Sequence, residues 1–186
     1  MRALAHMLDR LSAALNRIAL WGAVLAVSVM VLSASWQVIA RYVLDAPPVW
    51  TEELARRAMV WAGMLGASCA FRAQSDPTLF PGARCVAGRA GAALALVRAT
   101  GVALFAVPVI WYSLFGPGMD MARGFLGRSL GRDAEMINLP MIWFTAAVPV
   151  AFIIIIIHMF ATTAMHLTGQ ANMAANDGNI MENEGL

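Results

Sequence analysis

Two acidic and two basic residues, Glu52, Glu53, Arg56 and Arg57, stand directly before the uncharged segment 58–71. On a helix each acid lies one turn before a base, so Glu52 can pair with Arg56 and Glu53 with Arg57. This order suits the helix dipole, which favours negative charge near the N-terminus. Charges beside hydrocarbon are costly unless they are paired, so the cluster is a candidate site for assembly or docking. The alternative is an ordinary helix start at a membrane interface.

The other polar residues form no catalytic set. Of the three histidines, His158 and His166 share one apolar segment and His6 is expected at the surface, whereas a haem between helices needs a histidine from each of two. Cys69 and Cys85 have neither CxxC nor Cys/His metal spacing. We therefore predict no enzyme activity, no metal site and no cofactor.

The composition is that of a membrane protein. The chain has 186 residues, of which 60% are hydrophobic and only 13% charged, whereas a soluble domain carries about 25% charge. So much apolar surface cannot be buried in a water-soluble core of this size, so we expect the lipid bilayer to surround the chain. The formal net charge is only +2 and no basic stripe occurs, which argues against nucleic-acid binding.

We predict an all-α integral membrane protein with four transmembrane helices and a short N-terminal amphipathic interfacial helix. Apolar residues at helical steps place the interfacial helix at residues 1–17. The four-helix membrane domain is residues 18–168, and the polar tail 169–186 is predicted to be disordered. The spans are predicted at about 18–42, 50–71, 91–119 and 139–167.

Small residues spaced by four lie along two predicted spans. Such tracks let another helix approach closely, and we expect them to serve helix packing. The first track is Ala58, Ala62, Gly66 and Ala70, and the second is Gly91, Ala95, Ala99 and Ala103.

Arginine counts in the flanking segments predict the orientation. The N-terminal segment and the loop after the second span each hold three arginines, although the loop before the fourth span does so as well. By the positive-inside rule both termini are expected in the cytoplasm. Residues Arg41–Thr51 and Asp120–Asn138 are then periplasmic.

One stretch of the chain is similar to a known family. Its residues are Arg41-Tyr42, then Trp50-Thr51-Glu52-Glu53-Leu54-Ala55-Arg56, Val60-Trp61, Gly66-Ala67 and Phe71-Arg72. This pattern resembles the small membrane subunit (DctQ-type) of tripartite ATP-independent periplasmic (TRAP) transporters. The size, the four spans and the late Pro140 and Pro149 also fit. The segment 74–82 departs from the family's usual sequence after the second span, so the resemblance names no substrate subgroup.

The resemblance implies a transport role in the bacterial inner (cytoplasmic) membrane. Such transporters import organic acids, commonly carboxylates, driven by a sodium gradient. A periplasmic substrate-binding protein captures the substrate and a large membrane subunit carries it across. The small subunit would brace the large one and help dock the binding protein. The residues implied in assembly or docking are Trp50, Glu52, Glu53, Arg56 and Arg57.

A second class of protein stays open on the sequence. An independent four-helix membrane protein, such as a cytochrome-type membrane anchor or a small channel, has a similar composition and span count. A haem spectrum would favour the anchor, and ion flux through the purified chain alone would favour the channel. Neighbouring genes for a large membrane subunit and a periplasmic binding protein would favour the transporter.

Overall fold

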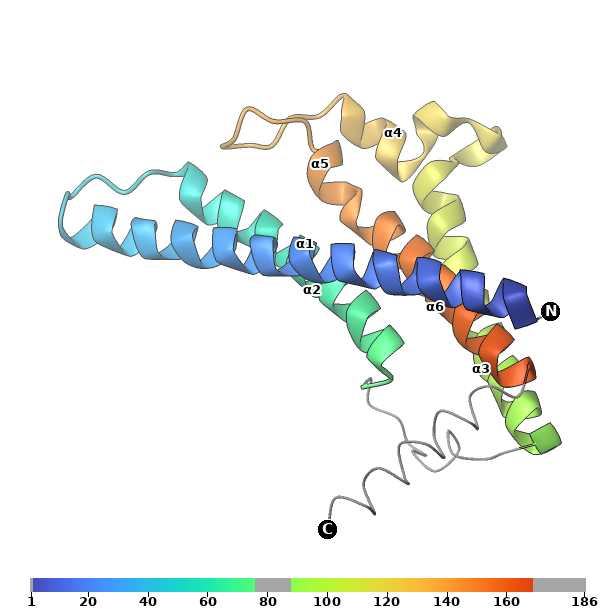
Figure 1. Ribbon diagram of the computed structural model, residues 1–186. Coiled ribbons are helices and arrows are strands. Elements are labelled where there is room, and N and C mark those ends of the chain that lie inside the picture. Colours follow the sequence, from blue (N-terminus) through green and yellow to red (C-terminus); the bar gives the residue numbers. More distant parts are fainter. Residues whose placement is uncertain (1, 76–87, 169–186) are drawn as a thin grey trace, which may run out of the picture.

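The computed structural model describes residues 2–75 and 88–168, and no β-strand occurs among them (Figure 1). This agrees with the predicted all-α class. The four long helices are α1 (Arg2–Tyr42), α2 (Trp50–Ala73), α3 (Gly88–Leu114) and α6 (Ala147–Leu167). Short helices connect α3 to α6: η2 (Pro117–Met119), η3 (Met121–Arg123), α4 (Phe125–Leu130) and α5 (Ile142–Thr145).

Helix α1 is a single helix of 41 residues. At ~1.5 Å per residue it is about 62 Å long, roughly twice the thickness of a bilayer's hydrocarbon core. The separate interfacial helix predicted for residues 1–17 is not confirmed, because the chain continues into the first span without a break. Between Arg2 and Tyr42 there is no proline and only one glycine, Gly22, so no residue stops the helix.

Three helical segments of the described residues are long and apolar enough to cross a membrane: Ala3–Tyr42, Ala90–Leu114 and Ile142–Leu167. Helix α2 is not among them, because its first turns carry four charged residues. At 24 residues it is long enough to span, so the fourth span stays a prediction.

Two of the predicted spans differ from the helices of the structure. Helix α3 ends at Leu114 and not at residue 119, because Gly116, Pro117 and a positive φ of 80° at Gly118 break the helical path. The last predicted span is divided into α5 and α6 just ahead of Pro149. This proline lies in the first turn of α6, where its missing N–H is tolerated.

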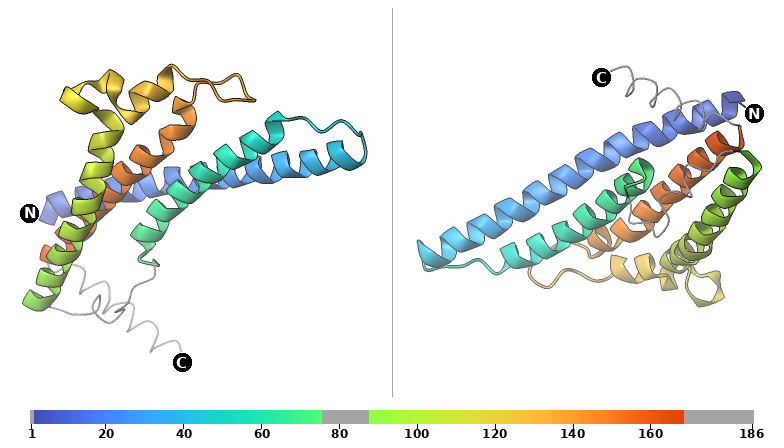
Figure 2. Two further views of the ribbon diagram at one scale, coloured as in Figure 1. Left: turned by 180° about the vertical axis from the view of Figure 1, so that it is seen from behind. Right: turned by 90° about the horizontal axis from the view of Figure 1, so that it is seen from below.

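The long helices form an open array, not a closed bundle (Figure 2). Helices α1 and α2 pack along each other as an antiparallel pair, α6 packs on both, and α3 packs mainly on α6. Helix α1 lies close to α2 at Gly22, where an added Cβ would be 2.8 Å from Leu65 Cδ1. Sequence analysis did not identify this glycine.

Candidate assembly sites at the two ends of α2

The charged cluster lies in the first turns of α2, as its spacing predicted. Arg56 Nη2 donates to Glu52 Oε1 at 3.2 Å, and Arg57 Nη2 donates to Glu53 Oε1 at 3.0 Å. Both predicted pairs are therefore confirmed as contacts, but their surroundings differ. The Glu52 and Arg56 side chains are each 63% exposed, whereas the Glu53 side chain is 6% exposed.

Glu53 also holds a distant loop. Its second carboxylate oxygen, Oε2, accepts a hydrogen bond of 2.7 Å from the backbone N–H of Met136. Both oxygens of this buried carboxylate therefore have donors, which is what a buried charge requires. The contact joins residues 83 apart in the chain, and no local pattern predicts it.

The segment that Glu53 holds is a hairpin-like loop of residues 132–141, here called the 132–141 loop, which is closed by an antiparallel bridge between Asp133 and Pro140. The N–H of Ala134 donates to Leu139 O at 2.9 Å, and the N–H of Met141 donates to Arg132 O at 2.8 Å. The loop therefore has its own backbone hydrogen bonds, and Glu53 fixes it against α2. Glu135 and Met136 are exposed on it.

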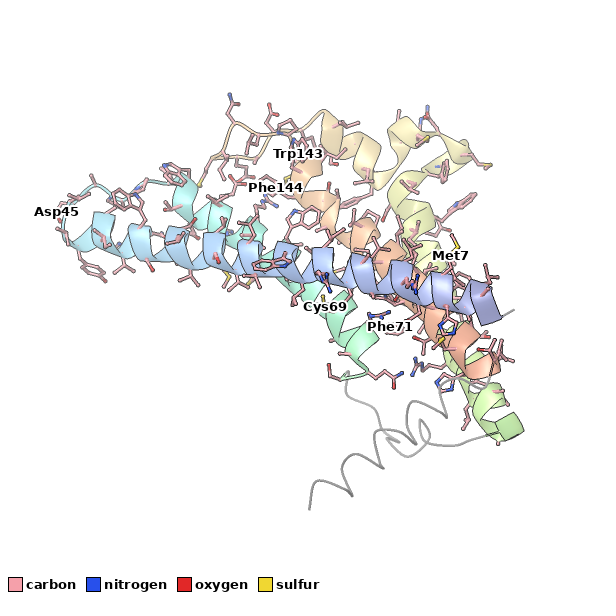
Figure 3. All side chains as sticks on the ribbon, viewed as in Figure 1. Met7, Asp45, Cys69, Phe71, Trp143 and Phe144 are labelled. Atoms are coloured by element: carbon pink, nitrogen blue, oxygen red, sulfur yellow. The ribbon has the colours of Figure 1, made fainter. Side chains whose placement is uncertain are left out.

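Two further residues of α2 continue this attachment at four-residue steps. The Arg57 guanidinium lies 5.7 Å from the centre of the Phe144 ring, a cation–π contact. Trp61 Nε1 donates to Trp143 O at 2.8 Å. One face of α2 thus holds the segment from the 132–141 loop to α5; Trp143 and Phe144 are labelled in Figure 3.

The opposite side of the cluster faces outward. Trp50, Glu52 and Arg56 are exposed, and a cleft of about 400 Å³ lies between the start of α2 and the 132–141 loop. The lining of this cleft combines both charge signs with apolar groups: Glu53, Arg56, Arg57, Met59, Val60, Glu135 and Met136. A partner with charged and apolar groups could bind there.

A second polar cluster, which sequence analysis missed, joins three helices at the other end of α2. Arg72 Nη2 donates to Asp9 Oδ1 at 3.1 Å, and Arg72 Nη1 donates to Ser12 Oγ. Ser12 Oγ lies 2.7 Å from Nδ1 of His158 on α6. Ser12 and His158 are both fully buried. The segment predicted as an amphipathic interfacial helix is therefore attached to α2 and α6.

Helix α3 is joined to the same end of α2. The Arg98 guanidinium lies 5.6 Å from the centre of the Phe71 ring, which is labelled in Figure 3. Cys69 Sγ donates to Asn16 O of α1 at 3.8 Å. The two polar clusters are about 28 Å apart along α2, from Glu53 to Arg72, which is close to the ~30 Å thickness of a hydrocarbon core.

The two small-residue tracks are only partly buried within the chain. Ala58 and Gly91 are buried, and the remaining members are half-buried: Ala62, Gly66, Ala70, Ala95, Ala99 and Ala103. At Gly66, and also at Gly63, an added Cβ would meet nothing within 4 Å. No contact in the described residues therefore requires glycine at these two positions, and their role in helix packing stays a prediction.

This arrangement defines a multi-pass helical membrane protein whose polar residues connect helices. Among residues 2–75 and 88–168 there is no group of three or more His, Cys, Asp or Glu side chains that could hold a metal ion.

The sequence model for the DctQ component of tripartite ATP-independent periplasmic transporters matches residues 30–169. The chain belongs to this family, as its motif indicated, and is a small permease component of a TRAP transporter. The family is a transporter component that works with other TRAP components in a membrane, and it is not an enzyme family. Comparison with curated proteins gives no match.

Proposed function

We propose that this chain braces the large membrane subunit of a TRAP transporter and helps dock the periplasmic substrate-binding protein. The transport reaction is sodium-driven import of an organic acid, most simply a carboxylate. Family membership supports this role. The observation that carries it is the structure at the Trp50 end of α2, where one face of the charged cluster holds the chain's own loop and the other faces outward.

The bracing role is supported by the open array of helices. Large apolar side chains are exposed along α1 and α3, including Trp21, Leu25 and Leu32 on α1 and Leu104 and Phe105 on α3. Lipid covers part of this surface. The outward face of α2, with its open positions at Gly63 and Gly66, suits the close approach of a helix from another subunit.

The docking role is supported by the 132–141 loop. By the positive-inside rule this loop and the start of α2 face the periplasm, with both termini in the cytoplasm of a bacterium whose inner membrane holds the protein. Glu52, Glu135 and Met136 are then exposed on the side from which a soluble binding protein arrives. Charged rims of this kind mainly steer encounter and set the orientation of a partner.

Co-production with the large subunit tests the bracing role. The tagged chain should recover the large subunit after detergent extraction, and the binding protein should be retained on the recovered pair at low salt. Recovery of the chain alone as a stable particle that conducts ions in lipid would contradict the proposal and favour the small channel. A haem absorbance spectrum in the purified chain would favour the cytochrome-type anchor.

A further inference from the structure

Among residues 2–75 and 88–168, only one ring nitrogen of His158 has a hydrogen-bond partner. The residue lies on α6 with 0% of its surface exposed, and its Nδ1 is 2.7 Å from Ser12 Oγ on α1. The other ring nitrogen, Nε2, is buried and has no partner among the described residues. A buried polar atom without a partner is costly, so its protonation state and its missing partner need an explanation.

The partners of Ser12 decide which ring nitrogen carries the proton. Arg72 donates to Ser12 Oγ, and an arginine side chain has donors only, so the serine accepts there. The hydroxyl's single proton must then find another acceptor. Four other serine hydroxyls donate to carbonyls of their own helices: Ser28, Ser68, Ser113 and Ser129. Within the described residues Ser12 has no such bond, and its second partner is His158 Nδ1.

We propose that Asp9, Arg72, Ser12 and His158 form one directed hydrogen-bond chain that ends at a binding site for a single ordered water. Arg72 donates to Asp9 and to Ser12, and Ser12 donates to His158 Nδ1. His158 is then neutral with its proton on Nε2, and this N–H donates to the water. The water donates in turn to Asn16 Oδ1.

Asn16 is the second partner because its Oδ1 is the other buried side-chain atom without a hydrogen bond in the described part of the chain. It lies one helical turn beyond Ser12. Helices α1 and α6 run in opposite directions (Figure 1), and side chains tilt toward the N-terminus of their own helix. This tilt brings the side chains of His158 and Asn16 toward the same level along α1. A water molecule can accept from one and donate to the other.

The chain of hydrogen bonds has a positioning role. It connects α1, α2 and α6 at one point, and it attaches the first turns of α1 to the other two helices. Asp9 is partly exposed and is the end of the hydrogen-bond chain that lies nearest the surface. Its negative charge pairs with the positive charge of Arg72. Each hydrogen bond in the chain needs its donor and acceptor at set positions. The length of the side chain at position 158 therefore decides whether the bond to Ser12 forms, and polarity alone is not enough.

Nitrogen NMR of the full chain, labelled at histidine with ¹⁵N and held in lipid nanodiscs, tests the proton's position. His158→Asn identifies the signals by removing them. We expect a neutral ring with a proton on Nε2 and none on Nδ1, and magnetisation transfer from water to the Nε2 proton that Asn16→Leu abolishes. A proton on Nδ1, or on both nitrogens, overturns the direction of the chain. No transfer from water overturns the water site.

Hydrogen exchange tests the positioning role with a matched pair of variants. In these variants the side-chain amide of asparagine can occupy the position of His158 Nδ1, whereas the side-chain amide of glutamine can occupy the position of His158 Nε2. His158→Gln and Ser12→Ala should speed amide exchange over residues 5–12 by about tenfold, while His158→Asn should stay within about threefold of the wild type. Exchange in α3 reports whether each variant is folded. Equal effects of Gln and Asn at position 158, with α3 unchanged, overturn the positioning role.

Discussion

Replacement of Glu53 by glutamine should release the 132–141 loop. Glutamine keeps one acceptor oxygen, but its NH₂ group must face Arg57 or the Met136 N–H, and both of these are donors. One of two hydrogen bonds that involve a charged group is lost, a cost of ~1.5–3 kcal/mol. The amide oxygen should face the charged Arg57 guanidinium, which leaves the Met136 N–H without its acceptor. The low end applies, because Met136 is exposed and water can replace part of the lost bond.

Glu52→Gln is the matched control, because it removes the same charge from the same turn of α2. Its pair with Arg56 is exposed, and such a pair contributes only ~0.2–0.5 kcal/mol. A free-energy change of ~1.4 kcal/mol changes an equilibrium constant tenfold. Glu53→Gln should therefore increase the equilibrium constant for opening of the loop about tenfold or more, and Glu52→Gln should increase it about twofold at most.

Hydrogen exchange of the amides of Ala134 and Met141 measures this opening, because their hydrogen bonds define the loop. We expect faster exchange in the Glu53 variant and near wild-type exchange in the Glu52 variant. The Glu53 variant should also lower substrate uptake while the subunit still inserts and the isolated binding protein still binds its ligand. Equal exchange in the two variants would refute the view that Glu53 holds the loop.

Three further predictions follow from the same structure. Gly66→Leu should reduce recovery of the large subunit at least severalfold, whereas Gly101→Leu, at an equally open position on α3, should not; equal recovery from both variants would show that the α2 track faces lipid. Arg56→Gln should lower uptake more than its weak helix pair explains, and wild-type uptake would leave the Glu52–Arg56 pair as an ordinary helix start. In a background without Cys69 and Cys85, cysteines at positions 46 and 138 should react with a reagent outside intact cells and one at 178 should not; the opposite pattern would invert the topology.

The structure selects the labelling positions of the last experiment. Gly127 lies in a periplasmic segment by the predicted topology, but an added Cβ there would be 2.2 Å from Met121 O, so a cysteine would distort the connection to α4. Ala46 and Asn138 are exposed and avoid this conflict.

The sequence predicts features that depend on short spacing. The Glu52–Arg56 and Glu53–Arg57 pairs follow from the four-residue repeat of a helix, and the apolar segments follow from composition. The family follows from the motif around them. Local patterns are sufficient for the ion pairs and the apolar segments, because each of these depends only on residues within one helix.

Contacts between segments far apart in the chain were not predictable in the same way. The hydrogen bond from Met136 to Glu53 and the contact of Ser12 with His158 join residues 83 and 146 apart. A serine on an apolar helix usually donates to its own backbone, so nothing marked Ser12 as different. The separate helix predicted for residues 1–17 is not confirmed for a related reason, because charged residues can end an apolar run without ending a helix.

Uptake into proteoliposomes tests the central proposal most directly. The large subunit and the binding protein are reconstituted with and without this chain, and a sodium gradient drives uptake of a labelled organic acid that the purified binding protein binds. We predict sodium-dependent uptake only when this chain is present, and none from the chain alone. Uptake at the same rate without the chain, with equal amounts of large subunit inserted, would contradict its role as a required subunit.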